Sequence, residues 1–384
     1  MVSRADRSFL AEWWRTIDKP LLSAFLFLMF CGLMLSFSAS PAVAERINLG
    51  EFHFVKRHVF FLVPAIVLLV GASMLTPTQV RRFAFLLFVI SILLLLFTLF
   101  AGFETKGSRR WISIAGFTLQ PSEFVKPAFV IITAWLFAEN SRRPDIPGNL
   151  FSIILFAIVG ALLMAQPDFG QTMLIAAAWG ALFFMAGMPW IWIAALSMIA
   201  IAGMLAAYVF FPHVAGRINR FITGEGDNFQ VNTGLEAIVN GGFLGQGPGE
   251  GTVKRILPDA HTDFVFAVAA EEFGIIACIL MVGVFGFIVV RTLKRAMHEQ
   301  DGYIRMASAG LVLLFGFQTF INIGVNLKLL PAKGMTLPFI SYGGSSMIAM
   351  SLGMGLLLAL TRVRAASHQK SSIGFVARFP KPAE

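Results

Sequence analysis

The carboxylate of Asp263 stands where a long polar segment meets a run of apolar residues. The stretch reads Pro258-Asp-Ala-His-Thr-Asp-Phe-Val-Phe-Ala-Val-Ala-Ala-Glu-Glu-Phe-Gly274. An ionisable group at such a boundary is costly unless it has a function or a partner. Partial burial disfavours its charged form, which would make it a better general base near neutral pH. The alternative is a helix cap formed by Thr262 or Asp263, and the spacing by itself favours this cap.

A second pair of charged residues could bind a ligand. Glu123 and Lys126 belong to Gln120-Pro-Ser-Glu-Phe-Val-Lys126, and residues three apart project from one face of a helix. The pair could be a structural ion pair. Alternatively, Lys126 could meet a phosphate while Glu123 orients a sugar, a base or a metal ion. The two interpretations are compatible, and both stay open.

Glycines gather in Gly245-Gln-Gly-Pro-Gly-Glu-Gly251. This segment superficially resembles a phosphate-binding loop, but it follows no predicted strand and does not end in Gly-Lys-Ser. A nucleotide site is therefore not expected. A flexible loop that packs closely at the mouth of a cavity is the better interpretation.

The elements that must position these residues are membrane helices. Hydrophobic residues make up 57% of the 384 residues and charged residues only 13%, which excludes an ordinary soluble protein. Apolar runs long enough to cross a bilayer predict ten spans, at roughly 20–38, 56–75, 83–101, 121–137, 150–166, 170–187, 190–211, 264–290, 304–326 and 344–361. The predicted fold is an all-α integral membrane protein, a polytopic bundle of ten transmembrane helices.

Lys and Arg in the short loops set the orientation of this bundle. The pairs Arg81-Arg82 and Arg142-Arg143, the cluster in 291–295 and the pair Arg362 and Arg364 fall on one side of the membrane, which the positive-inside rule makes the cytoplasm. The chain then divides into a cytoplasmic N-terminal tail at 1–19, a membrane domain at 20–364 and a cytoplasmic C-terminal tail at 365–384. A large extracytoplasmic loop runs from 212 to 262, between spans seven and eight. A loop of about 50 residues is usually functional, and within it residues 233–239 could form a short interfacial helix.

The outer side also carries many cations, among them Arg109, Arg110 and Lys333. These residues oppose the positive-inside rule, and an anionic substrate at the outer face explains them. The formal net charge of +9 suits an anionic lipid bilayer, and nothing in the chain resembles a nucleic-acid module. The two cysteines, Cys31 and Cys278, fall within predicted spans and have no disulfide or metal spacing.

Five segments in order resemble one family. They are Lys106-Gly-Ser-Arg-Arg-Trp-Ile112, Gln120-Pro-Ser-Glu-Phe-Val-Lys126, the glycine-rich 241–251, the stretch 258–274, and Leu330-Pro-Ala-Lys-Gly-Met-Thr-Leu-Pro-Phe-Ile-Ser-Tyr-Gly-Gly-Ser-Ser346. Together they closely resemble the SEDS family (shape, elongation, division and sporulation) over nearly the whole chain. Lys333 before Gly334 makes the chain look more like the division member than the elongation member.

The resemblance implies a peptidoglycan glycosyltransferase that polymerises lipid II into β-1,4 glycan strands. It would act at the outer, periplasmic face of the bacterial inner membrane, during septal cell-wall synthesis. The resemblance makes Asp263 the essential carboxylate, and the mechanism assigns it as general base in an inverting displacement of a polyprenyl pyrophosphate. Cations are needed to stabilise the charge on that leaving group. The implied substrate-binding residues are Arg109, Arg110, Trp111, Glu123, Lys126, His261, Lys333, Ser341 and Ser345. A divalent cation, Mg²⁺ or Mn²⁺, held partly by Glu123 or Asp263, could assist.

The family also implies partners: a class B penicillin-binding transpeptidase and other membrane proteins of the division machinery. Alternatives remain, namely a lipid II flippase, an elongation polymerase, or a scaffold that activates the transpeptidase. A flippase would need polar residues at mid-membrane depth. Here the ionisable residues cluster at the outer ends of the spans, which favours chemistry at the outer surface.

Overall fold

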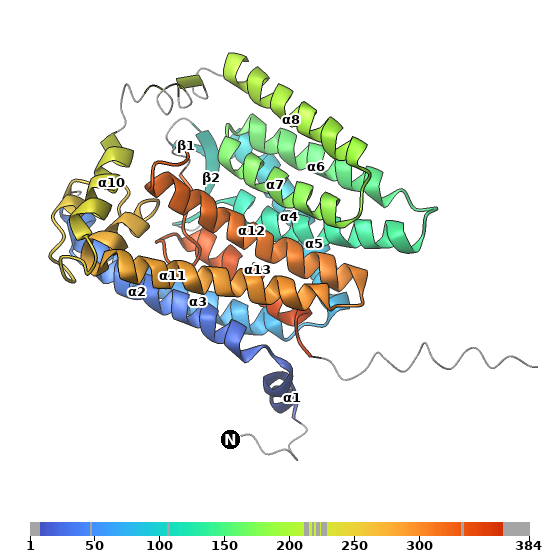
Figure 1. Ribbon diagram of the computed structural model, residues 1–384, viewed down its shortest axis with the longest axis horizontal. Coiled ribbons are helices and arrows are strands. Elements are labelled where there is room, and N and C mark those ends of the chain that lie inside the picture. Colours follow the sequence, from blue (N-terminus) through green and yellow to red (C-terminus); the bar gives the residue numbers. More distant parts are fainter. Residues whose placement is uncertain are drawn as a thin grey trace, which may run out of the picture.

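The computed structural model describes residues 8–46, 48–105, 108–114, 116–210, 229–331 and 334–363, together with 215, 216, 219 and 223. These residues form a bundle of helices with one small sheet (Figure 1). The helices are α1 (Phe9–Thr16), α2 (Lys19–Arg46), α3 (His53–Ser73), α4 (Pro77–Ala101), α5 (Pro121–Arg142), α6 (Gly148–Ala165), α7 (Phe169–Met185), α8 (Trp190–Phe210), α10 (Phe229–Gly241), α11 (Val265–Met297), α12 (Gly302–Asn326) and α13 (Gly344–Leu360), with a 3-10 turn, η1 (Val253–Arg255).

The predicted spans all correspond to helices. By length and composition, 8 helices of the described residues can cross a membrane: α2, α3, α4, α5, α6, α8, α11 and α12. The helices α7 and α13 are apolar but shorter, at 17 residues each. That length reaches about 26 Å, near the lower limit for a span. The two helices coincide with the predicted spans six and ten, so the ten-helix bundle is confirmed.

Packing separates the helices into an inner and an outer set. The helix α5 is almost entirely buried and packs against α4, α6, α7, α12 and α13. It begins at Pro121, whose fixed φ and missing N–H suit the first helical position. By contrast, α8 lies along the outside of the bundle (Figure 1), and none of its apolar window is buried. A helix that is apolar on all sides and exposed is suited to contact lipid.

A small antiparallel sheet follows α4, where the sequence suggested only a loop. Its strands β1 (Phe103–Thr105), β2 (Ser108–Ile114) and β3 (Phe117–Leu119) pair in the order β1-β2-β3. Gly116, at φ 82°, supplies a left-handed residue beside the start of β3. The sheet packs on α4 and α5, and it lies near the same end of the bundle as α10, away from α1 (Figure 1).

The described part of the long segment between α8 and α11 is bonded to a kink in α11. Gly274 has φ 78° and ψ 173°, which interrupts the helix. The glycine-rich segment 241–251 lies against this kink, and the Gln246 amide donates to the Glu271 carbonyl at 2.9 Å. The short helix expected at 233–239 is found inside α10, which packs on α11. The short helix and the close packing of the glycine segment are confirmed, whereas the cavity beside Asp263 is lined by none of the residues 241–251.

Two glutamates at the kink fasten the same loop through their side chains. The Glu271 carboxylate accepts hydrogen bonds from the amides of Val253 at 2.7 Å and Lys254 at 2.9 Å. The Glu272 carboxylate pairs with the Lys254 ammonium and with the Ser38 hydroxyl. Both glutamates are buried. They therefore hold the loop in place, and they are not free to share a site with Asp263.

Gly274→Ala is expected to lower the free energy of unfolding by about 2 kcal/mol, since a non-glycine residue is strained at positive φ. The added Cβ would also overlap the Phe243 carbonyl oxygen. Gly283→Ala is the control on the same helix, because a Cβ there meets nothing within 4 Å. Thermal unfolding in detergent micelles measures both variants. Equal unfolding temperatures would show that the kink does not require glycine.

Candidate active site around Asp263

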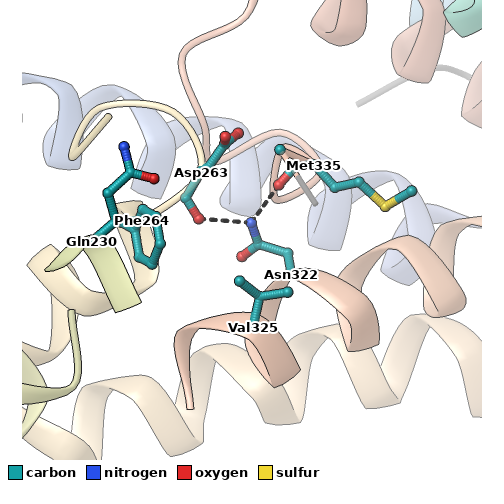
Figure 2. A pocket seen from close by; sticks show the side chains of 7 residues that line it. Gln230, Asp263, Phe264, Asn322, Val325 and Met335 are labelled. Atoms are coloured by element: carbon teal, nitrogen blue, oxygen red, sulfur yellow. Dashed lines mark hydrogen bonds between the residues drawn. The ribbon is translucent and has the colours of Figure 1, made fainter. Parts of the chain in front are cut away.

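Asp263 lies directly before α11, at the edge of a small cavity of about 30 Å³ (Figure 2). The side chain is half-buried. The helix begins at Val265. Its N-cap residue is Phe264, whose side chain makes no capping hydrogen bond. The helix-cap alternative is therefore not what the structure shows. The cavity lining is completed by Gln230, Phe264, Asn322, Val325, Gly334 and Met335.

The main chain around Asp263 is held at three consecutive carbonyls. The carbonyl of residue 261 accepts from the Tyr342 amide at 2.9 Å, and that of residue 262 from the Ser341 hydroxyl at 2.6 Å. The carbonyl of residue 263 accepts from the side-chain amides of Asn322 at 2.9 Å and Asn326 at 3.0 Å. All these donors come from α12 or from the segment that leads into α13. The segment 261–263 is thus fixed by two elements distant in sequence.

The carboxylate of Asp263 lies against the backbone of the segment that leads into α13. A Cβ added at Gly334 would lie 3.4 Å from Oδ2 of Asp263, and Gly334 has φ 62°. Lys333, which precedes this glycine, lies outside the described residues.

Glu123 and Lys126 form a buried ion pair, with 2.9 Å between Oε2 and Nζ. Only 4% and 1% of these residues are exposed, which supports the structural interpretation. Gln171 donates to Glu123 Oε1 at 2.7 Å, and Lys126 donates to Gln318 Oε1 at 3.0 Å. Gln318 in turn donates to the Thr336 carbonyl at 3.1 Å. The pair therefore connects to the segment beside Asp263. The Lys126 ammonium, which was expected to meet a phosphate, contacts Glu123 and Gln318 instead.

Asp168 extends this network to the sheet. Its carboxylate lies 3.5 Å from Nη1 of Arg110 and accepts from the Gln120 side chain at 3.4 Å. It also caps α7 by accepting from the Gln171 amide at 3.4 Å. Burial raises the pKa of the Asp168 carboxyl above its usual range, and the Arg110 guanidinium opposes that rise. Arg110 is thus held inward by a carboxylate.

The remaining predicted binding residues lie on β2, in the segment before α11, in the segment before α13 and on α13 itself. On β2, Arg109 is exposed and Trp111 is half-buried. The ring of His261 packs against Phe54, with 4.4 Å between ring centroids. Ser341 is buried, and its hydroxyl is engaged with the main chain on both sides, since it also accepts from the Leu337 amide at 2.7 Å. Ser345 is buried in the first turn of α13.

Four buried amides were missed by the sequence reasoning: Gln171, Gln318, Asn322 and Asn326. The signal was available, because carboxamides inside an apolar span are costly and face polar partners. On α12 the last three recur every four residues, so they share one face of the helix.

Of the two carboxylates predicted to hold a divalent cation, Glu123 does not suit that role. Both carboxylate oxygens of Glu123 already have partners, Gln171 and Lys126. Nowhere in the described part of the chain do three or more His, Cys, Asp or Glu side chains gather so that they could hold an ion. Glu123 is therefore unsuited to share a cation with Asp263.

Asp168→Asn is expected to leave the protein at least as stable at pH 7 as it was, whereas Asp168→Ala should cost about 1 kcal/mol because the cap is lost. Asn keeps the cap but removes a buried carboxyl group whose pKa is raised. With a raised folded-state pKa, the ionised carboxyl costs stability above that pKa, and the cost vanishes below the usual Asp range. The gain from Asn should therefore shrink as the pH falls towards about 4. Unfolding temperatures across this pH range test the expectation. A less stable Asn variant at pH 7 would show that the ion pair with Arg110 outweighs the cost of burying the charge.

Comparisons with known proteins agree with this architecture. The family model described as "Cell cycle protein", FTSW_RODA_SPOVE, matches residues 19–366. The probable peptidoglycan glycosyltransferase FtsW of Caulobacter vibrioides is 47% identical over 371 residues, covering 96% of this chain and 95% of the relative. The corresponding protein of Trichlorobacter lovleyi is 35% identical, covering 90% and 93%.

Solved structures show the same fold. A chain from a peptidoglycan synthase complex, described as coordinating polymerization and crosslinking, matches with a TM-score of 0.76 at 26% identity, covering 90% of this chain and 97% of that one. The Thermus thermophilus rod shape determining protein RodA matches with a TM-score of 0.66 at 25% identity, covering 91% and 97%. Since the family model spans all ten apolar helices and the relatives cover the whole bundle, the chain belongs to the SEDS family of membrane proteins, the cell cycle family of FtsW, RodA and SpoVE.

Proposed function

We propose that this protein is a peptidoglycan glycosyltransferase that polymerises lipid II during septal cell-wall synthesis. The observation that carries the proposal is the 47% identity, over 96% of the chain, to a relative named as a probable peptidoglycan glycosyltransferase. The arrangement of Asp263 supports it, because a half-buried carboxylate at the edge of a cavity is placed as a general base should be.

The reaction is a displacement at the anomeric carbon of the donor sugar. Asp263 removes the proton from the 4-hydroxyl of the acceptor sugar as that oxygen attacks. The bond between the anomeric carbon and the pyrophosphate oxygen breaks, and the polyprenyl pyrophosphate leaves with the electron pair. An in-line attack inverts the anomeric centre, so an α-linked pyrophosphate becomes a β-linked glycan.

The leaving group gains negative charge, which cations at the outer face would stabilise. Arg109 is exposed on β2 and suits this role, while Lys333 is proposed on sequence grounds alone. Lys126 is buried and paired, so it acts through its neighbours. Mg²⁺ often binds through one or two carboxylates together with substrate phosphates. A divalent cation held by Asp263 and the substrate therefore stays a prediction, and no step depends on it.

The protein would lie in the bacterial inner membrane with both termini in the cytoplasm and Asp263 on the periplasmic side. The solved relative that coordinates polymerization and crosslinking supports a class B penicillin-binding transpeptidase as partner, with other division proteins at the septum. Lys333 and the FtsW relatives favour division over elongation.

A lipid II flippase is the second candidate function. A transport path would need polar groups at mid-membrane depth. Glu123 and Lys126 lie in the first two turns of α5, and Asp168 directly precedes α7. These charges cluster at one end of their helices, which favours catalysis over translocation.

The purified protein, combined with a class B transpeptidase partner, should convert labelled lipid II into long glycan strands, visible on a gel and digestible by a muramidase. The partner by itself is the control and should make no polymer. In proteoliposomes, the same preparation should not accelerate lipid II movement between leaflets. Movement without polymer, under conditions in which a known polymerase is active, would overturn the proposal in favour of the flippase.

A further inference from the structure

We infer that Asn322 and Asn326, one turn apart on α12, are positioning residues that fix Asp263 for catalysis. The inference rests on the proposed glycosyltransferase function. Both side chains are buried, with 2% and 0% exposed. Amides buried in an apolar helix are costly unless each polar atom is satisfied. Their partners therefore indicate what they are for.

Asn322 joins the two segments that meet at the cavity. Its side-chain amide donates to the Asp263 carbonyl at 2.9 Å and to the Met335 carbonyl at 2.6 Å (Figure 2). A single NH₂ group thus uses both of its hydrogens to bridge the backbone of Asp263 and the backbone that follows Gly334. The distance between the carboxylate and the 334–337 segment is set by this bridge.

Asn326 completes the arrangement from one turn further along. Its amide donates to the same Asp263 carbonyl at 3.0 Å and to the Asn322 carbonyl at 2.9 Å. Its Oδ1 accepts from the Ala267 amide at 3.2 Å. Ala267 is the third residue of α11, whose amide an N-cap side chain normally satisfies. The same amide also donates to the Phe264 carbonyl at 3.0 Å. The side-chain cap that Phe264 lacks is thus added from α12.

The two amides hold Asp263 in place through its backbone and not through its carboxylate. Asn322 and Asn326 both donate to the main-chain carbonyl of Asp263, so neither amide occupies its carboxylate. Catalytic groups must be held closely, because a displacement of about 1 Å can cost about 100-fold in rate. The two amides would therefore raise the turnover number and leave substrate affinity nearly unchanged.

The test uses the full-length protein with its class B partner and labelled lipid II. Asn322→Leu keeps the approximate shape but removes both donors, and it should lower kcat about 10- to 100-fold with KM for lipid II within about 3-fold. Thr319→Val is the control on the same helix: its buried hydroxyl donates to the Phe315 carbonyl within α12 at 2.9 Å and does not reach Asp263. It should keep wild-type kinetics.

A second variant gives a measurement that would not change if Asn322 had only a structural role. In Asn322→Asp the carboxyl can donate only when protonated, so its rate relative to wild type should rise as the pH falls. In Asn322→Leu that ratio should not change with pH. Unfolding temperatures and size-exclusion profiles show whether the variants are folded.

The outcomes separate the two proposals. If the wild type makes no polymer, the glycosyltransferase function fails. If the wild type polymerises and Asn322→Leu matches it, the positioning role fails and the function stands. A raised KM with unchanged kcat, or a folding defect in both Asn322 variants, would also overturn the positioning role, in favour of substrate binding or of helix packing.

Discussion

Asp263→Asn is expected to lower lipid II polymerisation by about 10²- to 10⁴-fold, the usual contribution of a general base. The substitution keeps the size of the side chain and removes its ability to accept a proton. The Asn322 and Asn326 amides bond the main-chain carbonyl of this residue, which the substitution leaves unchanged, so the segment should keep its place. Gel analysis of glycan strands made with the class B partner measures the loss.

Asp259→Asn is the matched control for this variant. Asp259 is a carboxylate four residues earlier, in the same outer segment, and it has φ 54°. Asn tolerates that left-handed conformation well, so this variant should fold and keep wild-type activity. Polymerisation by Asp263→Asn at the wild-type rate would remove Asp263 from the catalytic role. Equal loss in both variants would point to a general effect of charge in the loop.

The membrane architecture could be predicted because hydropathy is set by the bilayer. A span needs about 20 apolar residues, so α4 and α8 stand out in the sequence whatever they pack against. The kink at Gly274 could not be located in the same way. A glycine inside a helix is common, and only the loop packed against it shows why φ must be positive there.

The sheet was missed for a related reason. Its strands have 3, 7 and 3 residues, too short to give a clear alternating pattern. They also lie between spans, where Lys, Arg and Gly indicate a loop. The sheet nonetheless positions Arg110, because Arg110 lies on β2. Its guanidinium points inward, where it pairs with Asp168.

The position of Asp263 at the end of a span was predictable, but its surroundings were not. Asn322, Ser341 and Tyr342 lie at least 59 residues away in sequence, and no local pattern links them to it. Long-range contacts of this kind follow from how α11, α12 and α13 pack. The sequence pointed to the carboxylate, and the structure adds the residues that hold it.

Lys126→Met is expected to destabilise the protein by about 3–5 kcal/mol, because it leaves the Glu123 carboxylate buried without its cation. Glu123 is 4% exposed, and its remaining partner, Gln171, is neutral. The control is Arg143→Met, at the C-cap of the same helix. Arg143 pairs with Glu139 at 3.4 Å, but its side chain is 67% exposed, so its loss should cost about 0.5 kcal/mol or less. Thermal unfolding in detergent measures both variants.

The double variant Glu123→Gln with Lys126→Met decides between the two interpretations of this pair. It removes both charges, and the amide oxygen introduced at position 123 can still accept from Gln171, so stability should return to within about 1 kcal/mol of wild type. Because Lys126 is buried and bound to Gln318, polymerisation should return together with stability. A double variant that is stable yet inactive would contradict this expectation and assign Lys126 to the substrate. In that case the Lys126 ammonium would have to leave Glu123 during the reaction in order to reach the substrate.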